Sequence, residues 1–380
     1  MMATPALLAL TLALQSGTVP SPAPAGAQAS TFLRSLLETS RAPALTGAVA
    51  VGGRLVFSEG VGTADIERHV AAGTGTVFNI GSLSKLETAV AVMQLVEAGR
   101  VRLDDDVRTY VPSFPPKGAP ITILELLTHS SGIRNYRDSD FPDTPEHDNL
   151  KPFATFEEAI SLFKDDPLLF PPGRFFFYSS YAVNLLQGVI EKAGGQPFEE
   201  YMREHVWRRA GMTHSCFDVP GRAIADRARS YRLRGPSIEP IQTYDLTYKF
   251  ASGGMLGTAE DLVRLACALN AGTLLRPATV AEMFGPVASP TLWYRGEKPP
   301  GRERYRQAIM WRVLDDQGRR LIYECGSING FNMCLVDDVG EDIVSALATN
   351  CWSSAGGWKQ TLELGGFLRP AQPRREAPSK

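Results

Sequence analysis

The sequence predicts an α+β fold, in which an antiparallel β-sheet is built from both termini, is flanked by helices and receives a mostly helical inserted subdomain. Two observations predict it. Residues 104–250 carry helical segments joined by Pro-rich and Gly-rich loops. Short apolar runs typical of strands occur on either side of that region, at residues 47–51, 54–59, 320–324, 331–336 and 343–349.

The N-terminal elements are a helix, a hairpin and a third strand. Residues 31–38 predict a short helix, and the first two strand runs are separated by a Gly-Gly pair that is typical of a hairpin. Residues 77–80 predict a third short strand. From Ser82 apolar residues recur at helical spacing and stop before Gly99, so we expect a helix that starts at Ser82.

The middle of the chain is expected to be helical and the end to return to the sheet. Four helical segments are predicted at residues 122–127, 156–163, 181–193 and 198–209. Residues 135–154 lack periodicity and predict a long surface loop that borders a site. A helix to Leu269 precedes the final strands, and a helix at 358–368 closes the domain. A crevice between sheet and helices is the expected site.

The N-terminus carries an apolar stretch, residues 6–14, followed by Ala27-Gln28-Ala29. This pattern predicts an export signal at 1–29 and a periplasmic or extracellular protein. No Lys or Arg precedes the apolar stretch, so a disordered leader stays open as the alternative.

The remaining boundaries follow from composition. A catalytic domain is expected at residues 30–368, and a polar Pro/Arg tail at 369–380 is expected to be disordered. Nothing after the leader approaches the roughly 18 apolar residues of a transmembrane helix, so we expect no integral membrane association.

Charge and cysteine content exclude several classes of function. The net charge of −2 comes from 39 basic and 41 acidic residues in a mixed pattern, which favours a small acyl or peptide substrate over nucleic acid. Five cysteines leave at least one thiol unpaired, and their pairing and the oligomeric state stay open. Neither CxxC nor HExxH occurs, so we expect no metal.

The sharpest chemical signal is the sequence GSLSK at residues 81–85, where a strand is expected to meet a helix. Residues three apart in a helix share a face, so Ser82 and Lys85 can meet. A lysine amine can remove the serine proton only if burial or positive charge lowers its pKa. Alone, such a tetrapeptide is more often a capping serine with an exposed lysine.

Further motifs follow in order, and together they resemble the class C β-lactamases and related penicillin-binding proteins over residues 32–368. The motifs are FNIGSLSK (78–85), LDDDV (103–107), ITILELLTHSSGI (121–133), PG (172–173), FYSSY (177–181), GMT (211–213), GGM (253–255), GS (326–327) and GF (330–331).

The resemblance implies roles for five residues. It makes Ser82 the nucleophile, Lys85 its partner and Tyr178 a proton relay. It places the oxyanion hole at the backbone N–H groups of Ser82 and Ser327, with Gly326 allowing close approach of the substrate. No cofactor is implied.

Two substrate-binding positions depart from the family pattern. Ser180 stands where the family has Asn, and it reaches less far. Glu324 stands where the family has Lys or His, so a carboxylate-bearing substrate would be repelled and a neutral or cationic one favoured. The alternative is that Glu324 points to solvent or pairs with Arg319 or Arg320.

Three neighbouring candidates are expected to be structural. Cys325 alternates away from its flanking site residues, so burial against a helix is expected rather than nucleophilic chemistry. His129 is expected to make a structural hydrogen bond at a helix end. Ser130 and Ser131 share that interpretation.

The sequence therefore predicts a serine hydrolase that forms an acyl-enzyme on Ser82, acting on a carboxylic ester or a small peptide or amide. Weak β-lactamase activity is left open. The alternative is a catalytically silent protein that binds a peptide or cell-wall fragment on the same scaffold.

Overall fold

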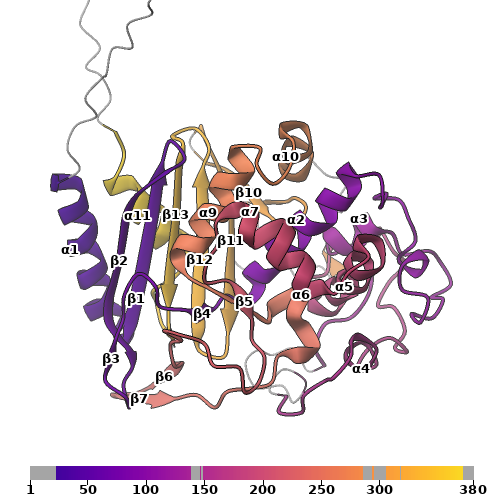
Figure 1. The fold of residues 1–380 in the computed structure, drawn as a ribbon, viewed down its shortest axis with the longest axis horizontal. Coiled ribbons are helices and arrows are strands. Elements are labelled where there is room, and N and C mark those ends of the chain that lie inside the picture. The colour runs from indigo at the N-terminus through magenta and orange to yellow at the C-terminus, as the bar shows by residue number, and fades with distance from the viewer. Residues whose placement is uncertain are drawn as a thin grey trace, which may run out of the picture.

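The centre of the molecule is an eight-stranded antiparallel sheet in the order β3-β2-β1-β13-β12-β11-β10-β9 (Figure 1). The computed structural model describes residues 23–137, 146, 149–285, 293–294, 305–316 and 318–370. The strands of this sheet are β1 (Ala44–Val51), β2 (Arg54–Asp65), β3 (Val70–Ala71), β9 (Arg306–Gln307), β10 (Arg312–Asp316), β11 (Arg319–Ile328), β12 (Phe331–Asp338) and β13 (Ile343–Thr349).

Both termini contribute to this sheet, as the sequence predicts. Strand β1 pairs antiparallel with β13, from Leu45 opposite Thr349 to Val51 opposite Ile343. The Gly-Gly hairpin between β1 and β2 is confirmed, and both glycines have positive φ angles. Strands β9 and β10 were not predicted, and they extend the sheet beyond β11.

Helices cover both faces of the sheet. Helix α1 (Ala23–Ser40) and helix α11 (Trp358–Phe367) lie together on one face, where Leu33 and Leu364 pack with Leu45 and Leu347. Helix α9 (Ala259–Asn270) contacts β1 and β13 from the other face, and the remaining helices lie beyond it (Figure 1).

Most of the regular secondary structure in the inserted region is helical, although loops make up much of its length. Its helices and those flanking it are α2 (Ser84–Glu97), α3 (Ile123–Leu127), α4 (Phe156–Ile160), α5 (Ser180–Gly194), α6 (Phe198–Tyr201), α7 (Arg208–Ala210), α8 (Phe250–Gly253) and α10 (Pro277–Phe284). The predicted helix at 198–209 contains a π-helical segment, Met202–Trp207, between α6 and α7. Part of the predicted loop at 135–154 lies outside the described residues.

Two small sheets complete the fold. One consists of β4 (Phe78–Asn79), β8 (Met255–Gly257) and β5 (Cys216–Phe217), and the other of β14 (Cys351–Trp352), β6 (Tyr231–Arg234) and β7 (Ser237–Pro240). The strand expected at 77–80 therefore exists but belongs to a separate sheet. It leads directly into the Ser82 turn.

Helix α1 begins earlier than predicted and crosses the expected signal boundary. Ala29 is fully buried against the sheet, and the Ser30 hydroxyl donates a hydrogen bond to Glu59 of β2. The predicted cleavage before Ser30 would thus cut a packed helix. Export itself stays a prediction, since residues 1–22 lie outside the described part of the chain, as does most of the predicted tail.

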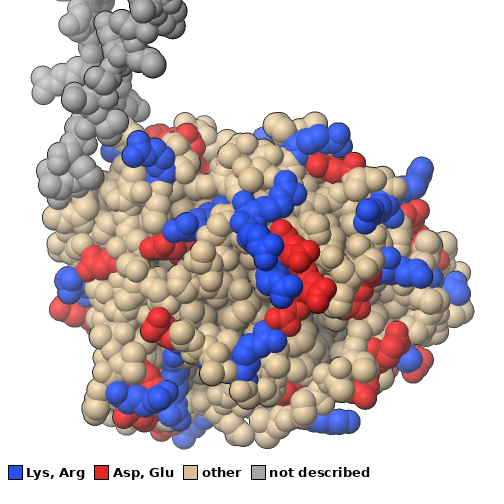
Figure 2. Space-filling model, viewed as in Figure 1, with Lys and Arg blue, Asp and Glu red and all other residues tan. Residues whose placement is uncertain are grey.

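Charges of both signs are interspersed over the face shown in Figure 2. This distribution agrees with the near-zero net charge of the sequence. Among the described helices, none is long and apolar enough to cross a bilayer.

Candidate active site

Ser82 lies on a tight connection between the small sheet and helix α2. The turn Gly81–Leu83 is a single 3₁₀ turn, and α2 follows it without interruption. Gly81 has φ of +53°, and its N–H donates to the Asn79 side chain at 2.9 Å. A glycine suits this left-handed conformation because it has no Cβ. The expected strand-to-helix junction is confirmed, with one extra 3₁₀ turn.

Lys85 faces Ser82 from the first turn of α2. Its Nζ lies 3.1 Å from the Ser82 Oγ and donates to the Ser252 carbonyl at 2.5 Å. Lys85 is almost fully buried, and burial lowers its pKa to about 7. A substantial fraction of the amine is therefore neutral near pH 7 and able to accept a proton.

Tyr178 completes a set of three around the nucleophile. Its hydroxyl donates to the Ser82 Oγ at 2.7 Å, and the Lys85 Nζ lies 5.0 Å from its ring centroid. His129 supports this ring at a centroid distance of 4.4 Å, while its Nδ1 accepts the Ser179 N–H at 3.3 Å. The structure thus gives His129 the structural role expected of it.

Backbone amides of two elements meet beside Ser82. A Cβ on Gly326 would lie 2.9 Å from the Ser82 nitrogen and 2.0 Å from the Ile80 carbonyl oxygen. A Cβ on Gly81 would lie 3.0 Å from the Ser327 nitrogen. The two amides expected to form the oxyanion hole therefore lie at one close contact between the Ser82 turn and β11.

Ser180 is near this set but turned to protein partners. It opens helix α5, is buried, and its N–H donates to the Asn135 side chain at 3.0 Å. Its side chain also lies close enough to Tyr136 to influence the pKa of that hydroxyl. Asn135 was not predicted as a site residue, and only its place at the start of the expected loop pointed to it.

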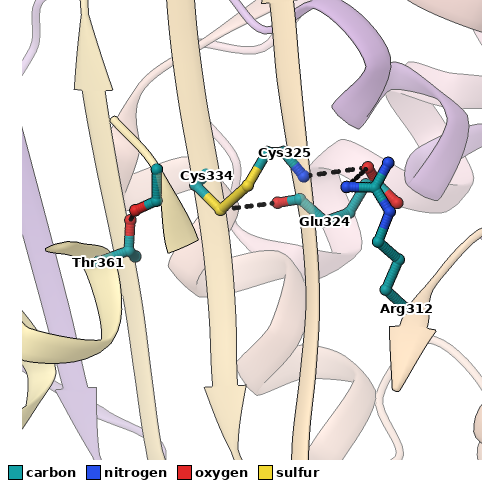
Figure 3. Close-up of a disulfide and its surroundings, with 6 residues drawn as sticks. Arg312, Glu324, Cys325, Cys334 and Thr361 are labelled. Carbon is teal, nitrogen blue, oxygen red and sulfur yellow. Dashed lines mark hydrogen bonds and ion pairs between the residues drawn. A yellow bond between two sulfur atoms is a disulfide. The ribbon is translucent and has the colours of Figure 1, made fainter. Parts of the chain in front are cut away.

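Glu324 is buried on β11 and pairs with Arg312, not with Arg319 or Arg320 (Figure 3). Its Oε1 lies 3.0 Å from the Arg312 Nη1. Burial dominates the pKa of Lys85, while Glu324 raises that pKa and Arg312 lowers it. Glu324 stands where the family pattern has a cation, and Arg312 on the neighbouring strand β10 thus brings a cation next to that position.

Arg312 was not predicted as a site residue because the strand that carries it, β10, was not predicted. The strand is short, and its hairpin signal is an Asp/Gln/Gly turn before Arg319 that could have revealed it.

Cys325 forms a disulfide with Cys334, directly opposite on β12. In Figure 3, Cys325 and Glu324 point to opposite sides of β11, as strand alternation requires. Cys325 is thus neither a free thiol nor a nucleophile, although its cluster does pack against α11. The remaining cysteines, 216, 267 and 351, are unpaired.

A second buried lysine, Lys249, lies beside this site and was not predicted. Its Nζ is 4.6 Å from the Tyr136 ring centroid, and a Cβ on Gly253 would lie 3.5 Å from that Nζ. Burial, and then the charge of Lys85, lowers its pKa well below the ordinary value. No periodic pattern in the sequence distinguishes this lysine from an exposed one.

The described residues contain no cluster of three or more His, Cys, Asp or Glu side chains placed to hold a metal ion. The arrangement around Ser82 offers side chains and backbone amides that can act chemically themselves. It places one hydroxyl between an amine and a phenol, next to two backbone amides.

Comparison with proteins of known sequence gives long matches. Serine beta-lactamase-like protein LACTB, mitochondrial, from Mus musculus is 28% identical and covers 80% of this chain and 70% of its own. The Bos taurus protein of the same name is 30% identical, with 72% and 63% covered. Putative penicillin-binding protein PbpX of Bacillus subtilis is 29% identical, with 65% and 60% covered. The chain thus spans 60–70% of these relatives' lengths.

Solved structures share the fold. A penicillin-binding protein homologue from Pyrococcus abyssi has a TM-score of 0.72 at 26% identity, with 86% of this chain and 73% of that chain covered. EstCE1, described as a hydrolase with promiscuous acyltransferase activity, has a TM-score of 0.75 at 23% identity, with 90% and 98% covered.

The family described as Beta-lactamase matches residues 29–364, which is most of the chain. The chain therefore belongs to the Beta-lactamase family.

Proposed function

We propose that this protein hydrolyses carboxylic esters or small amides through an acyl-enzyme on Ser82. One observation carries the proposal: the Ser82 Oγ lies within hydrogen-bonding distance of both the Lys85 amine, at 3.1 Å, and the Tyr178 hydroxyl, at 2.7 Å. A serine hydroxyl needs such a base to become an effective nucleophile.

The proposed reaction has two halves. The Ser82 Oγ attacks the acyl carbon while its proton passes to the neutral Lys85 amine, directly or through Tyr178. The Ser82 and Ser327 amides stabilise the negative oxygen of the tetrahedral intermediate. The bond to the leaving group then breaks, the leaving group takes the proton, and water later releases the acid by the same route.

The fold neighbours support a choice among acyl substrates. They include EstCE1, a hydrolase with promiscuous acyltransferase activity, and a D-amino acid amidase from Ochrobactrum anthropi complexed with D-phenylalanine, so this fold accommodates acyl-transfer and amide chemistry. For this chain, we propose esters and small amides as better substrates than β-lactams, because Glu324 and Ser180 stand at positions that would otherwise bind a substrate carboxylate.

The test measures adduct formation and turnover together. Purified protein is incubated with a fluorophosphonate probe, short-chain nitrophenyl esters and a chromogenic β-lactam, and intact mass is followed alongside product release. We expect a covalent adduct on the wild type that Ser82→Ala abolishes. The control is Ser113→Ala, an exposed serine on another loop, which should label like the wild type.

The Tyr178→Phe variant tests the proposed proton-relay role of Tyr178 while leaving the nucleophile Ser82 in place. It removes the hydroxyl next to Ser82 but keeps the ring that packs on His129. We expect kcat to fall about 100-fold or more, with the protein still folded. If folded wild type forms no Ser82-dependent adduct with any probe, the alternative of a silent binding protein takes the place of this proposal.

A further inference from the structure

Arg312 brings a largely buried cation to the edge of the site. It opens β10, and its guanidinium lies 5.1 Å from the Tyr305 ring centroid and 6.0 Å from that of Tyr323. Its Nε is buried and has no hydrogen-bond partner within the described part of the chain. A guanidinium that is rigidly packed and not fully satisfied is suited to bind a carboxylate.

The position of this cation is close enough for it to act on the reacting groups. The Arg312 charge lowers the pKa of Lys85, and Arg312 interacts electrostatically with Tyr178. Glu324 acts on Lys85 in the opposite direction. Both members of the ion pair therefore lie in the electrostatic environment of the nucleophile.

The carboxylate of Glu324 is held in place by its own strand. Its Oε1 accepts the Cys325 N–H at 3.1 Å in addition to its contact with Arg312. The Cys325–Cys334 disulfide ties this part of β11 to β12 (Figure 3). A carboxylate anchored in this way occupies Arg312 without a substrate and costs little conformational entropy to keep there.

We propose that Glu324 occupies, as an internal carboxylate, the position on Arg312 that a substrate carboxylate would take, so that the site selects neutral acyl groups. The inference rests on the proposed Ser82 chemistry and adds the substrate class. A substrate carboxylate must either displace Glu324 or lie beside its negative charge, and both are unfavourable where water is largely excluded. A neutral acyl chain meets no such penalty.

The experiment compares two esters that differ only at the end of the acyl chain. These are 4-nitrophenyl pentanoate, which is neutral, and the mono-4-nitrophenyl ester of glutaric acid, which ends in a carboxylate. The readout is the ratio of kcat/KM for the glutarate ester to that for the pentanoate ester. Using this ratio cancels changes in Ser82 reactivity that affect both substrates.

We expect the wild type to favour pentanoate. Glu324→Gln and Glu324→Ala should raise the ratio about tenfold or more, which is the scale of one charge-assisted hydrogen bond. Adding Arg312→Met to Glu324→Gln should return the ratio to the wild-type value, because the cation is then gone. The matched control is Glu199→Gln, which breaks a surface pair with Arg222 and should leave the ratio unaltered.

Two results would overturn the inference while leaving Ser82 chemistry intact. One is an unaltered ratio in both Glu324 variants that still form the Ser82 adduct. The other is a raised ratio that persists in the Glu324→Gln/Arg312→Met double variant. Absence of Ser82-dependent turnover with both esters in the wild type would instead overturn the proposed function on which the inference rests.

Discussion

The Lys85 amine is the residue on which the proposed chemistry most depends, and its protonation sets the active pH range. Burial lowers its pKa to about 7, so the amine is neutral above that pH and charged below it. Since only the neutral amine accepts the Ser82 proton, we expect kcat/KM for a neutral ester to rise with pH through about 7 and then level off. A pH profile of initial rates measures this directly.

The two members of the Glu324–Arg312 ion pair should shift this pH profile in opposite directions. Glu324 raises the pKa of Lys85, so Glu324→Gln should move the acid limb to lower pH. Arg312 lowers that pKa, so Arg312→Met should move the limb to higher pH. The same profiles of Glu199→Gln serve as the control. Shifts of equal sign in the two site variants would contradict the assigned electrostatics.

At this scale the sequence predicted what local spacing determines. Ser82 and Lys85 share a helix face, and Gly326 and Glu324 share a strand face, so their neighbourhood follows from periodicity. Arg312 and Lys249 come from other elements and reach the site only through tertiary packing. Local patterns carry no information about such contacts.

At the scale of elements, the oxyanion hole depends on how closely β11 approaches the Ser82 turn. Gly326→Ala would place a Cβ 2.0 Å from the Ile80 carbonyl oxygen and 2.9 Å from the Ser82 nitrogen. The strand must then move away from the turn, so we expect kcat/KM to fall at least about 100-fold. Steady-state ester hydrolysis, with circular dichroism to verify folding, measures the effect.

Gly340→Ala provides the matched control for that change. No atom lies within 4 Å of a Cβ at this position, so the variant should keep wild-type activity. A folded Gly326→Ala protein with undiminished acylation would show that the amides of Ser82 and Ser327 do not act together.

The same strand carries a second testable element, the Cys325–Cys334 disulfide across β11 and β12. Reduction should lower the free energy of unfolding by about 2–3 kcal/mol, because a closed loop restricts the unfolded chain. Urea unfolding with and without reductant measures it. The Cys325→Ser/Cys334→Ser double variant should no longer respond to reductant, and a wild type equally stable when fully reduced would contradict the prediction.

The sequence could not decide this cysteine pairing, for a physical reason. Cys325 and Cys334 are opposite only because the turn after Ile328 sets the register of β11 against β12. A shift of one residue would separate them. The alternation of β11 was visible in the sequence, whereas the register between strands was not.

For the whole molecule, the sequence predicted the architecture because strand patterns at both ends leave few ways to form one sheet. It missed β9 and β10, which are short, and it ended the leader inside helix α1. Small residues such as Ala29 suit both a cleavage motif and a tightly packed helix, so the leader at 1–29 stays a prediction although its last residues lie in α1.

A buried acid, Glu87, should make the stability of the whole fold depend on pH. It lies in α2, and its Oε2 accepts the Trp207 indole N–H at 2.6 Å. Burial raises its pKa from 4.5 to about 8, and the charge of Asp261 adds to this rise. Between these two values the unfolded chain releases the proton while the folded protein keeps it. Stability from this group therefore falls as pH rises from 4.5 to 8.

Glu87→Gln removes that dependence and keeps the shape of the side chain. At pH 8 we expect the free energy of unfolding of the variant to exceed that of the wild type by a few kcal/mol at most. At pH 4.5 the two proteins should be nearly equal in stability. Urea unfolding at pH 4.5, 6 and 8 measures the trend, with Glu199→Gln as the exposed control. Lys249→Met should show the opposite pH dependence, in that its gain in stability over the wild type should shrink as pH rises. A buried lysine whose pKa is lowered penalises folding below its unfolded pKa, and this penalty fades as pH rises. Equal gains for both variants at every pH would mean that packing, and not proton binding, governs these sites.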